Sequence, residues 1–340
     1  MTSDPGLYMK TALAGPQRGF MVDVLFIKTS SLGDVVHNMP AVTDARRARP
    51  TARLVWVVEE AFVPLARLHP GVDEVVPVAW RRWRRALQRR STWQEIRRFV
   101  ASLRGRDYDA VIDTQGLVRT AVITRFARGR RHGYDRRSVR EGLATLCYEV
   151  RHSVGRDLHA VARNRLLTGA ALGYVPEGPV DYGLDRAALA PRAERPYAIL
   201  LHATARAEKE WPEADWIALG RALADRDLDV VLPWGTPAEE ARAKRLADAL
   251  PRVRIPDRRP LDEVARLIAG ATVVVGVDTG LLHLAAALGV PLVSIFVGSE
   301  PALTGPTGTG PIVTLGGDGL RCGLAEVEAA VDRVLPLRTR

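Results

Sequence analysis

Short apolar runs rich in β-branched residues recur along the chain, separated by longer segments with apolar positions three or four residues apart. The runs predict buried strands and the longer segments predict helices. In the first half the predicted strands are residues 22–27, 54–58, 74–78 and 108–112. The predicted helices are residues 35–47, 62–68, 83–103 and a segment after 116, and residues 135–170 are expected to be helical. Alternating strands and helices predict a parallel, doubly wound α/β sheet.

The proline- and glycine-rich segment 173–196 interrupts this pattern, and we interpret it as a linker between domains. After it, the predicted strands are residues 197–202, 229–232, 252–255, 273–277 and 292–296. The predicted helices are residues 212–225, 237–250, 261–269, 281–288 and 325–334, and residues 305–319 are expected to form a glycine-rich loop.

The chain is therefore predicted to fold as two Rossmann-like domains that face each other across a cleft. The first domain is expected at 21–172 and the second at 197–324, followed by a C-terminal helix and tail at 325–340. Residues 1–20 show no period, and we expect a disordered extension there. Both Met1 and Met21 remain candidates for the natural start.

The most informative run is VVVGVDTGLLHLAAALGVPLVSIFV, residues 273–297, which predicts a strand, a short helix and a second strand. Asp278 and Thr279 suit the start of the helix, and Gly280 would let a phosphate approach its backbone N–H groups. His283 lies on the first turn. The ordinary structural explanation, a buried unit with helix caps and a hydrogen-bonded core histidine, stays open.

A second polar turn, Ser30-Ser31-Leu32-Gly33-Asp34, follows the first predicted strand, where ligands collect in open α/β sheets. Gly33 permits a tight turn and close approach of a substrate. Asp34 either caps the following helix or accepts a proton from a substrate hydroxyl in the cleft.

Two further turns in the second half carry candidate donor-binding residues. Thr204 and Lys209 follow the strand predicted at 197–202, where a hydroxyl and an ammonium group can hold and neutralise a phosphate. A solvated loop lysine is the alternative for Lys209. Glu239 either binds ribose hydroxyls or simply favours the start of its helix.

The formal charge of the 340-residue chain is +10, which predicts an acidic partner. Arginines are densest around Arg81, Arg84 and Arg85, with tryptophans interleaved. Such a segment suits a membrane surface or a phosphorylated acceptor, and a solvated surface helix is the alternative. Nucleic acid is possible on charge alone, but no nucleic-acid-binding motif accompanies the arginines.

Several other classes of protein are disfavoured. No G-x-G-x-x-G motif follows the first predicted strand of either domain, and no P-loop or H-E-x-x-H motif occurs. Three D-x-D matches, at 107–109, 225–227 and 227–229, precede predicted strands and so lie at the wrong edge for a ligand. The two cysteines suggest neither a zinc site nor a disulfide framework, so a reduced cytosolic setting fits. No apolar run spans a bilayer, and no secretory signal is visible.

Taken in order, the runs resemble the bacterial lipopolysaccharide heptosyltransferases, glycosyltransferase family 9. The resemblance covers roughly residues 22–320. It rests on VLFIKTSSLGDVVHNMPAV, WVVEE, VVPV followed by RRWRR, YDAVIDTQGLVRTA, HATAR with KEWP, LPWGTPAEEARAKRLA and VDTGLLHLAAAL.

The resemblance implies a GT-B fold and an inverting transfer of L-glycero-D-manno-heptose from ADP-heptose, without a required metal. Asp34 matches the general base, and Lys209 would stabilise the leaving group. The donor-binding positions it implies are Thr204, Ala205, Lys209, Glu239, Asp278, Thr279, Gly280 and His283. Ala205 replaces a threonine common in similar enzymes, which removes a phosphate hydrogen bond worth about 1 kcal/mol.

The implied acceptor is the Kdo of Kdo2-lipid A, at the cytoplasmic face of the inner membrane. From position and charge we expect acceptor contacts from Ser30, Ser31, Gly33, Arg81, Arg84, Arg85 and Arg140. Addition of the second heptose is the alternative activity, and a non-catalytic sugar-nucleotide-binding protein is the alternative class. We expect no nucleic-acid partner and no cofactor.

Overall fold

The fold is described from a computed structural model of the chain. It describes residues 22–204, 210–297, 301–317, 320 and 322–335. The predicted extension at 1–20 and the end of the predicted tail lie outside the described residues.

The N-terminal half is built on a six-stranded parallel sheet with the order β3-β2-β1-β4-β5-β6. Its strands are β1 (Asp23–Ile27), β2 (Arg53–Glu59), β3 (Glu74–Val78), β4 (Asp107–Asp113), β5 (Arg128–Tyr134) and β6 (Val150–His152). Its helices are α1 (Leu32–Ala48), η2 (Glu60–Phe62), α2 (Val63–Ala66), α3 (Trp80–Trp83), α4 (Arg90–Arg104), α5 (Val118–Thr124), η3 (Gly142–Cys147) and α6 (Ala160–Leu172).

The C-terminal half is built on a second six-stranded parallel sheet with the order β12-β11-β10-β7-β8-β9. Its strands are β7 (Tyr197–Leu201), β8 (Asp229–Val231), β9 (Val253–Arg254), β10 (Val273–Val277), β11 (Leu292–Phe296) and β12 (Ile312–Gly316). Its helices are α8 (Glu213–Asp225), α9 (Pro237–Ala247), α10 (Leu261–Ala269), α11 (Gly280–Ala287), α12 (Pro301–Thr304) and α13 (Leu324–Val334).

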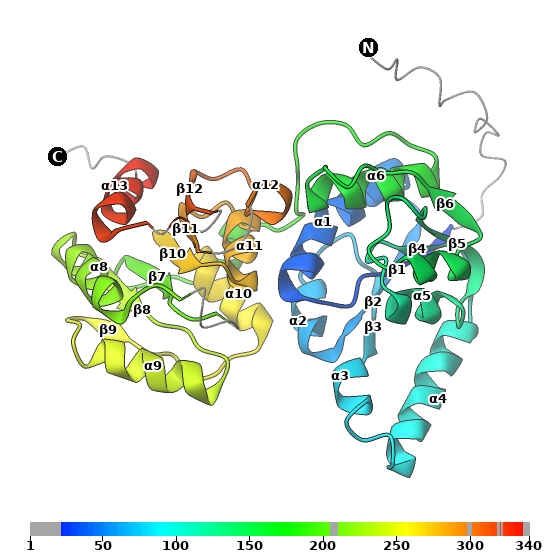
Figure 1. Cartoon of the computed structure of the whole chain (residues 1–340), viewed down its shortest axis with the longest axis horizontal. Coiled ribbons are helices and arrows are strands. Elements are labelled where there is room, and N and C mark those ends of the chain that lie inside the picture. Colours follow the sequence, from blue (N-terminus) through cyan, green and yellow to red (C-terminus); the bar gives the residue numbers. More distant parts are fainter. Residues whose placement is uncertain (1–21, 205–209, 298–300, 318–319, 321, 336–340) are drawn as a thin grey trace.

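The central strands of both sheets are apolar because both of their faces are covered. Every residue of β7, β10 and β11 is buried, and so are four of the five residues of β1. This is the pattern of parallel strands packed between helices. The two sheets lie side by side, and α1 of one half meets α11 of the other between them (Figure 1). The predicted linker region, residues 173–196, contains α7 (Arg186–Leu189).

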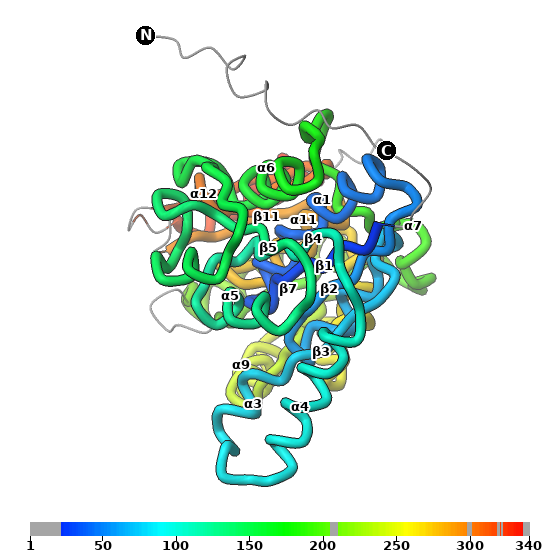
Figure 2. The backbone as a smooth tube through the Cα atoms, turned by 90° about the vertical axis from the view of Figure 1, so that its right-hand side faces the viewer, coloured from blue at the N-terminus to red at the C-terminus, as the bar shows by residue number. Residues whose placement is uncertain are grey.

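The helix predicted at 83–103 is wrong as a single element. The chain instead forms α3, a turn and α4, and this hairpin projects from the body of the N-terminal half (Figure 2). The indole of Trp83 is buried and packs against Phe99 on α4, with ring centroids 5.6 Å apart. An arginine-rich segment gives no periodic signal for such a turn. The packing of α3 against α4 therefore accounts for the break between the two helices.

Strands at or near the sheet edges were also missed. The prediction of helix over 135–170 is wrong for β6, and the loop predicted at 305–319 contains β12. Both are edge strands, and β5 beside β6 carries the polar sequence RGRRHGY. Edge position is not the reason, because the edge strands β3 and β9 were predicted. β6 has only three residues, and β12 lies in a glycine-rich segment that predicts a loop.

Within the described ranges, no helix is long and apolar enough to cross a membrane.

Candidate active site

The turn after β1 is fixed by Gln115, which follows β4. Its Oε1 accepts from the backbone N–H of Thr29 at 2.7 Å and from the Thr29 hydroxyl at 3.0 Å. Its Nε2 donates to the carbonyl of Ser30. Asp113, buried at the end of β4, accepts from the backbone N–H of Gln115 at 2.9 Å and so holds the second loop in turn. Two neighbouring strand ends thereby become one rigid polar edge.

Asp34 lies on the first turn of α1 and uses its two carboxylate oxygens differently. Oδ2 accepts from the backbone N–H of Ser31 at 2.9 Å and from its hydroxyl at 3.3 Å, which caps the helix. Oδ1 faces Lys28 Nζ at 3.9 Å and Arg140 Nη1 at 3.5 Å. The structure therefore shows the helix-capping role of Asp34, and its role as a base stays a prediction.

The charge state of Asp34 follows from these neighbours. Burial raises the pKa of the carboxyl group, whereas the cations Lys28 and Arg140 and the Ser31 hydrogen bonds lower it, and the net shift is downward. Asp34 is thus a carboxylate at neutral pH. A partly buried carboxylate with one oxygen unused by its helix cap is suited to accept a proton.

Lys28 is a site residue that the sequence reasoning did not select. Its ammonium group is buried and donates to the carbonyl of Thr114 at 2.9 Å and to Oδ1 of Asn164 at 3.3 Å. Burial lowers its pKa to about 8. The signal was present, because a lysine that directly follows an apolar strand lies at the ligand-binding edge.

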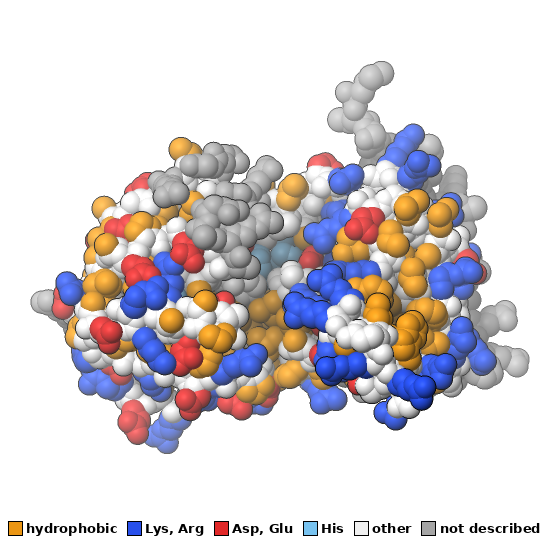
Figure 3. Space-filling model, turned by 60° about the horizontal axis from the view of Figure 1, so that its bottom comes forward, with side chains coloured by type: hydrophobic (Ala, Val, Ile, Leu, Met, Phe, Trp, Pro, Cys, Tyr) orange, Lys and Arg blue, Asp and Glu red, His pale blue; other side chains and the backbone are white. Residues whose placement is uncertain are grey.

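The basic residues divide into two groups. Arg140 reaches Asp34, and Arg119, which was not selected, donates from Nη2 to the hydroxyl of Ser30 at 2.9 Å. Arg81, Arg84 and Arg85 are exposed on α3 and the turn after it. Figure 3 shows Lys and Arg side chains gathered beside the hollow between the two halves. The structure brings Arg140 to the candidate base, and the acceptor roles of all these residues stay predictions.

The facing turn lies in the C-terminal half, between β10 and α11. Thr279 is the N-cap residue of α11, with an extended backbone, and Gly280 is the first helical residue. The hydroxyl of Thr204 donates to the carbonyl of Asp278 at 3.1 Å, so the turn after β7 is joined to the turn after β10. Ala205 and Lys209 lie outside the described residues.

Two glycines let the halves approach closely. A Cβ on Gly280 would lie 2.6 Å from Cβ of Leu32, and a Cβ on Gly33 would lie 2.7 Å from Cδ2 of His283. The space beside Gly280 in this direction is filled by the opposite half. The reason predicted for this glycine, phosphate approach, is therefore joined by a packing reason that the sequence does not reveal.

His283 is also turned toward the N-terminal half. Its Nδ1 lies 3.1 Å from Nε2 of His37 on α1, and the ring of His159 lies 5.4 Å from that of His37. Burial lowers the pKa of His283 to about 4 and lowers that of His37 well below its usual value. Histidine side chains are visible at the bottom of the hollow (Figure 3). A neutral histidine pair thus joins the halves, and donor binding by His283 stays a prediction.

Glu239 closes a capping box at the start of α9. Its Oε2 accepts from the backbone N–H groups of Gly235 at 2.7 Å and Thr236 at 3.2 Å. The structure thus shows the helix-capping role of this carboxylate, and its contact with ribose remains a prediction.

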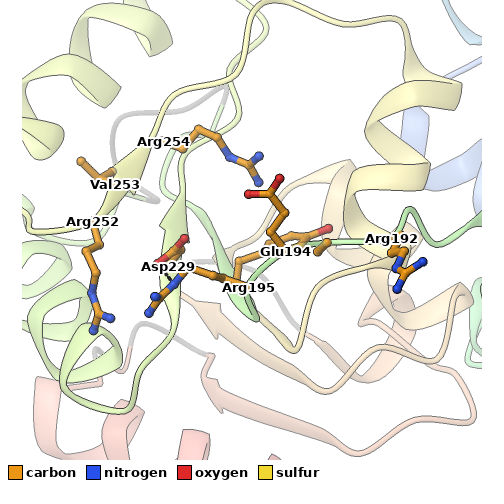
Figure 4. Close-up of a pocket in the computed structure, with 9 residues that line it drawn as sticks. Arg192, Glu194, Arg195, Asp229, Arg252, Val253 and Arg254 are labelled. Carbon is orange, nitrogen blue, oxygen red and sulfur yellow. Dashed lines mark ion pairs between the residues drawn. The ribbon is translucent and has the colours of Figure 1, made fainter.

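A cavity of about 640 Å³ lies elsewhere, at the amino ends of β7, β8 and β9 (Figure 4). Arg195 at its wall pairs with Asp229 at 3.4 Å and with Asp227 at 2.8 Å. The last two D-x-D matches therefore form ion pairs at the edge opposite the candidate site. Among the described residues, no group of three or more His, Cys, Asp or Glu side chains could hold a metal ion.

Two parallel-sheet halves whose polar turns meet across a cleft define a GT-B protein, the architecture of nucleotide-sugar glycosyltransferases. The profile of glycosyltransferase family 9 (heptosyltransferase) matches residues 96–317. The chain is 45% identical to lipopolysaccharide heptosyltransferase 1 of Escherichia coli K12, over 85% of this chain and 92% of that protein. It is 47% identical to the heptosyltransferase 1 of Pseudomonas aeruginosa, over 87% of this chain and 84% of that protein. The chain belongs to glycosyltransferase family 9.

A solved structure, E. coli heptosyltransferase WaaC with ADP, matches with a TM-score of 0.87 and 41% identity, covering 92% of this chain and 99% of that one. The same enzyme with ADP-2-deoxy-2-fluoro heptose matches with a TM-score of 0.83 and the same identity and coverage. The expected GT-B fold is confirmed.

Proposed function

We propose that this protein transfers L-glycero-D-manno-heptose from ADP-heptose to the Kdo of Kdo2-lipid A, as an inverting enzyme of lipopolysaccharide core synthesis. The observation that carries the proposal is the placement of Asp34. It is an ionised, partly buried carboxylate flanked by two cations at the face where the start of α11 meets α1. We assign acceptor binding to residues 21–172 and donor binding to residues 197–324.

The donor side is supported by the ADP and ADP-heptose analogue bound in the related WaaC structures. In this chain the start of α11 offers backbone N–H groups and a partial positive charge to a diphosphate. Thr204, linked to the carbonyl of Asp278, lies beside that start. Lys209 would neutralise the departing phosphate, because a full charge exceeds the partial charge of a helix end.

The reaction needs a base on the side opposite the diphosphate. Asp34 accepts the proton of the attacking hydroxyl as the bond between the sugar and the phosphate breaks, and ADP departs toward the C-terminal half. Lys28 and Arg140 keep Asp34 deprotonated in the resting enzyme. Gln115 and Ser31 hold the turn so that the carboxylate needs no rearrangement before the reaction.

The acceptor side is supported by the arginines of the N-terminal half. Arg119 and Arg140 lie next to the turn that carries Asp34, and the α3–α4 hairpin carries exposed arginines beyond it. An acceptor with carboxylates and phosphates suits this surface. We place the enzyme at the cytoplasmic face of the inner membrane, where the basic hairpin would contact anionic lipid.

Addition of the first heptose rather than the second is favoured by the relatives. The identity to heptosyltransferase 1 extends over 294 residues, whereas identity to E. coli heptosyltransferase 2 is 32% over only 104 residues. Radiolabelled ADP-heptose should label Kdo2-lipid A, and the mono-heptosylated acceptor should be labelled far more slowly. The reverse preference would assign the second step.

A non-catalytic sugar-nucleotide-binding protein would bind ADP-heptose in calorimetry and label neither acceptor. Retention on DNA at physiological salt would instead point to a nucleic-acid partner. Each outcome would contradict the proposed transfer.

A further inference from the structure

An apolar cavity of about 140 Å³ lies in the N-terminal half, between the α3–α4 hairpin and α5. Its wall is formed by Trp83, Ile96 and Phe99 of the hairpin and by Val122 and Ile123 of α5. The lining is almost entirely hydrocarbon. An apolar cavity of this size accepts an apolar guest of about the volume of benzene. That volume corresponds to a short stretch of hydrocarbon chain.

Two arginines, Arg84 and Arg119, also line the cavity. Arg119 donates to the hydroxyl of Ser30, four residues before the candidate base. Arg119 therefore links the lining of the cavity to the turn that carries Asp34. Figure 3 shows hydrophobic side chains beside the basic cluster on this part of the surface.

The residues at the opening are unusually exposed for their type. Leu87 is 47% exposed, Trp80 39% and Val122 38%. Single exposed apolar residues are common, but here they converge on one cavity. A guest that enters from the acceptor side would cover them.

We propose that this cavity binds the first part of an acyl chain of the lipid acceptor. The inference rests on the proposed function and adds a lipid subsite to it. The guest must join an anionic head to a hydrocarbon chain, because two arginines belong to a lining that is otherwise hydrocarbon. An acylated, phosphorylated sugar has this chemistry. Each methylene buried there is expected to strengthen binding about fourfold.

The test compares one substitution at the opening with a matched one elsewhere. Leu87→Glu places a carboxylate beside the hydrocarbon path at an exposed position that tolerates charge. Leu166→Glu makes the same change on α6, where the leucine is 39% exposed and does not line the cavity. The Michaelis constant for acylated Kdo2-lipid A should rise at least tenfold in Leu87→Glu alone. With the fully deacylated acceptor, both variants should match the wild type.

A second measurement does not depend on transfer. Calorimetry with dodecyl phosphate, below its micellar concentration, should show binding to the wild type and to Leu166→Glu. Binding to Leu87→Glu should be at least tenfold weaker. If Leu87→Glu loses dodecyl phosphate binding, and neither the wild type nor the variants transfer heptose, the cavity holds a chain and the proposed function fails.

Three results would overturn the inference. One is an equal rise of the Michaelis constant of Leu87→Glu for the acylated and the deacylated acceptor, which would indicate a disturbed polar site. Another is dodecyl phosphate binding that Leu87→Glu leaves unchanged. The third is a molecular mass, measured by light scattering, that is larger for the wild type than for Leu87→Glu. It would show that the cavity receives a second copy of the chain.

Discussion

The turns that meet across the cleft are built in opposite ways. The turn after β1 is held by side chains from three other segments, through Gln115, Asn164 and Arg119. The turn after β10 leads directly into the backbone of α11, whose first helical residue is Gly280, and the hydroxyl of Thr204 donates to the carbonyl of Asp278. A base must be fixed in charge and position before the reaction, whereas a helix start can hold a diphosphate with backbone N–H groups alone.

Apart from loss of the base itself, the largest effect is expected from the contact between the two turns. Gly280→Ala places a Cβ against Cβ of Leu32 at 2.6 Å, so the halves must separate. Overpacking of this kind costs about 1–3 kcal/mol, and if this cost falls on the closed, active arrangement, kcat/KM should fall by roughly 5- to 160-fold. Alanine is the better helix former, so the helix itself is not weakened.

The matched control is Gly142→Ala, because a Cβ there would meet nothing within 4 Å. The contact between the halves is irrelevant to catalysis if both alanine variants turn over at the wild-type rate.

The second prediction concerns the charge beside the base. Lys28→Met removes a cation that lowers the pKa of Asp34, so that pKa must rise. A base with a raised pKa loses its proton at higher pH, so the acidic limb of the kcat/KM profile should move to higher pH. Lys244→Met, on the exposed face of α9, is the control. An acidic limb that stays in place would show that Asp34 does not set it.

The third prediction concerns the acceptor side. Arg119→Gln removes the hydrogen bond to Ser30 and one charge from the acceptor side. A charge-assisted hydrogen bond from Arg119 to the acceptor would be worth about 1.5–3 kcal/mol, so its loss should raise the Michaelis constant for the acceptor by roughly tenfold or more. The affinity for ADP-heptose should not change. Arg125→Gln, at the end of the same helix, should behave like the wild type, and equal effects from both variants would rule out a specific role for Arg119.

The smallest effect concerns the histidine pair. The pKa of His283 is about 4 in the folded protein and about 6.5 in an unfolded chain, so between these values the unfolded chain binds more protons. Stability contributed by neutral His283 is therefore complete above pH 6.5 and is lost as the pH falls toward 4. The melting temperature should fall by several degrees more in the wild type than in His283→Gln over this range. If the melting temperatures of the wild type and His283→Gln fall in parallel with pH, His283 does not have the lowered pKa assigned to it.

Sequence reasoning found the elements whose burial is complete. β1, β7, β10 and β11 are continuous apolar runs, and the polar turns after β1 and β10 follow from where those runs end. It missed β5, whose sequence is polar, β6, which has three residues, and β12, which lies in a glycine-rich segment.

The candidate site residues that the sequence analysis selected are those whose signal lies within one segment. Asp34 and the Asp278-Thr279-Gly280 turn could be selected because each follows its own strand. The supporting network could not, because Thr29 and Gln115 are 86 residues apart and His37 and His283 are 246 apart. Such pairs depend on which strands become neighbours, and the local pattern does not encode that order.

The central claim is that Asp34 supplies the base while the opposite turn holds the donor. The most direct test is Asp34→Asn, with Kdo2-lipid A as acceptor and with ADP-heptose binding measured separately by calorimetry. Asparagine keeps the shape of the side chain but cannot accept the proton. Turnover should fall by about 10²–10⁴-fold with an unchanged dissociation constant for ADP-heptose. Turnover close to that of the wild type would contradict the account.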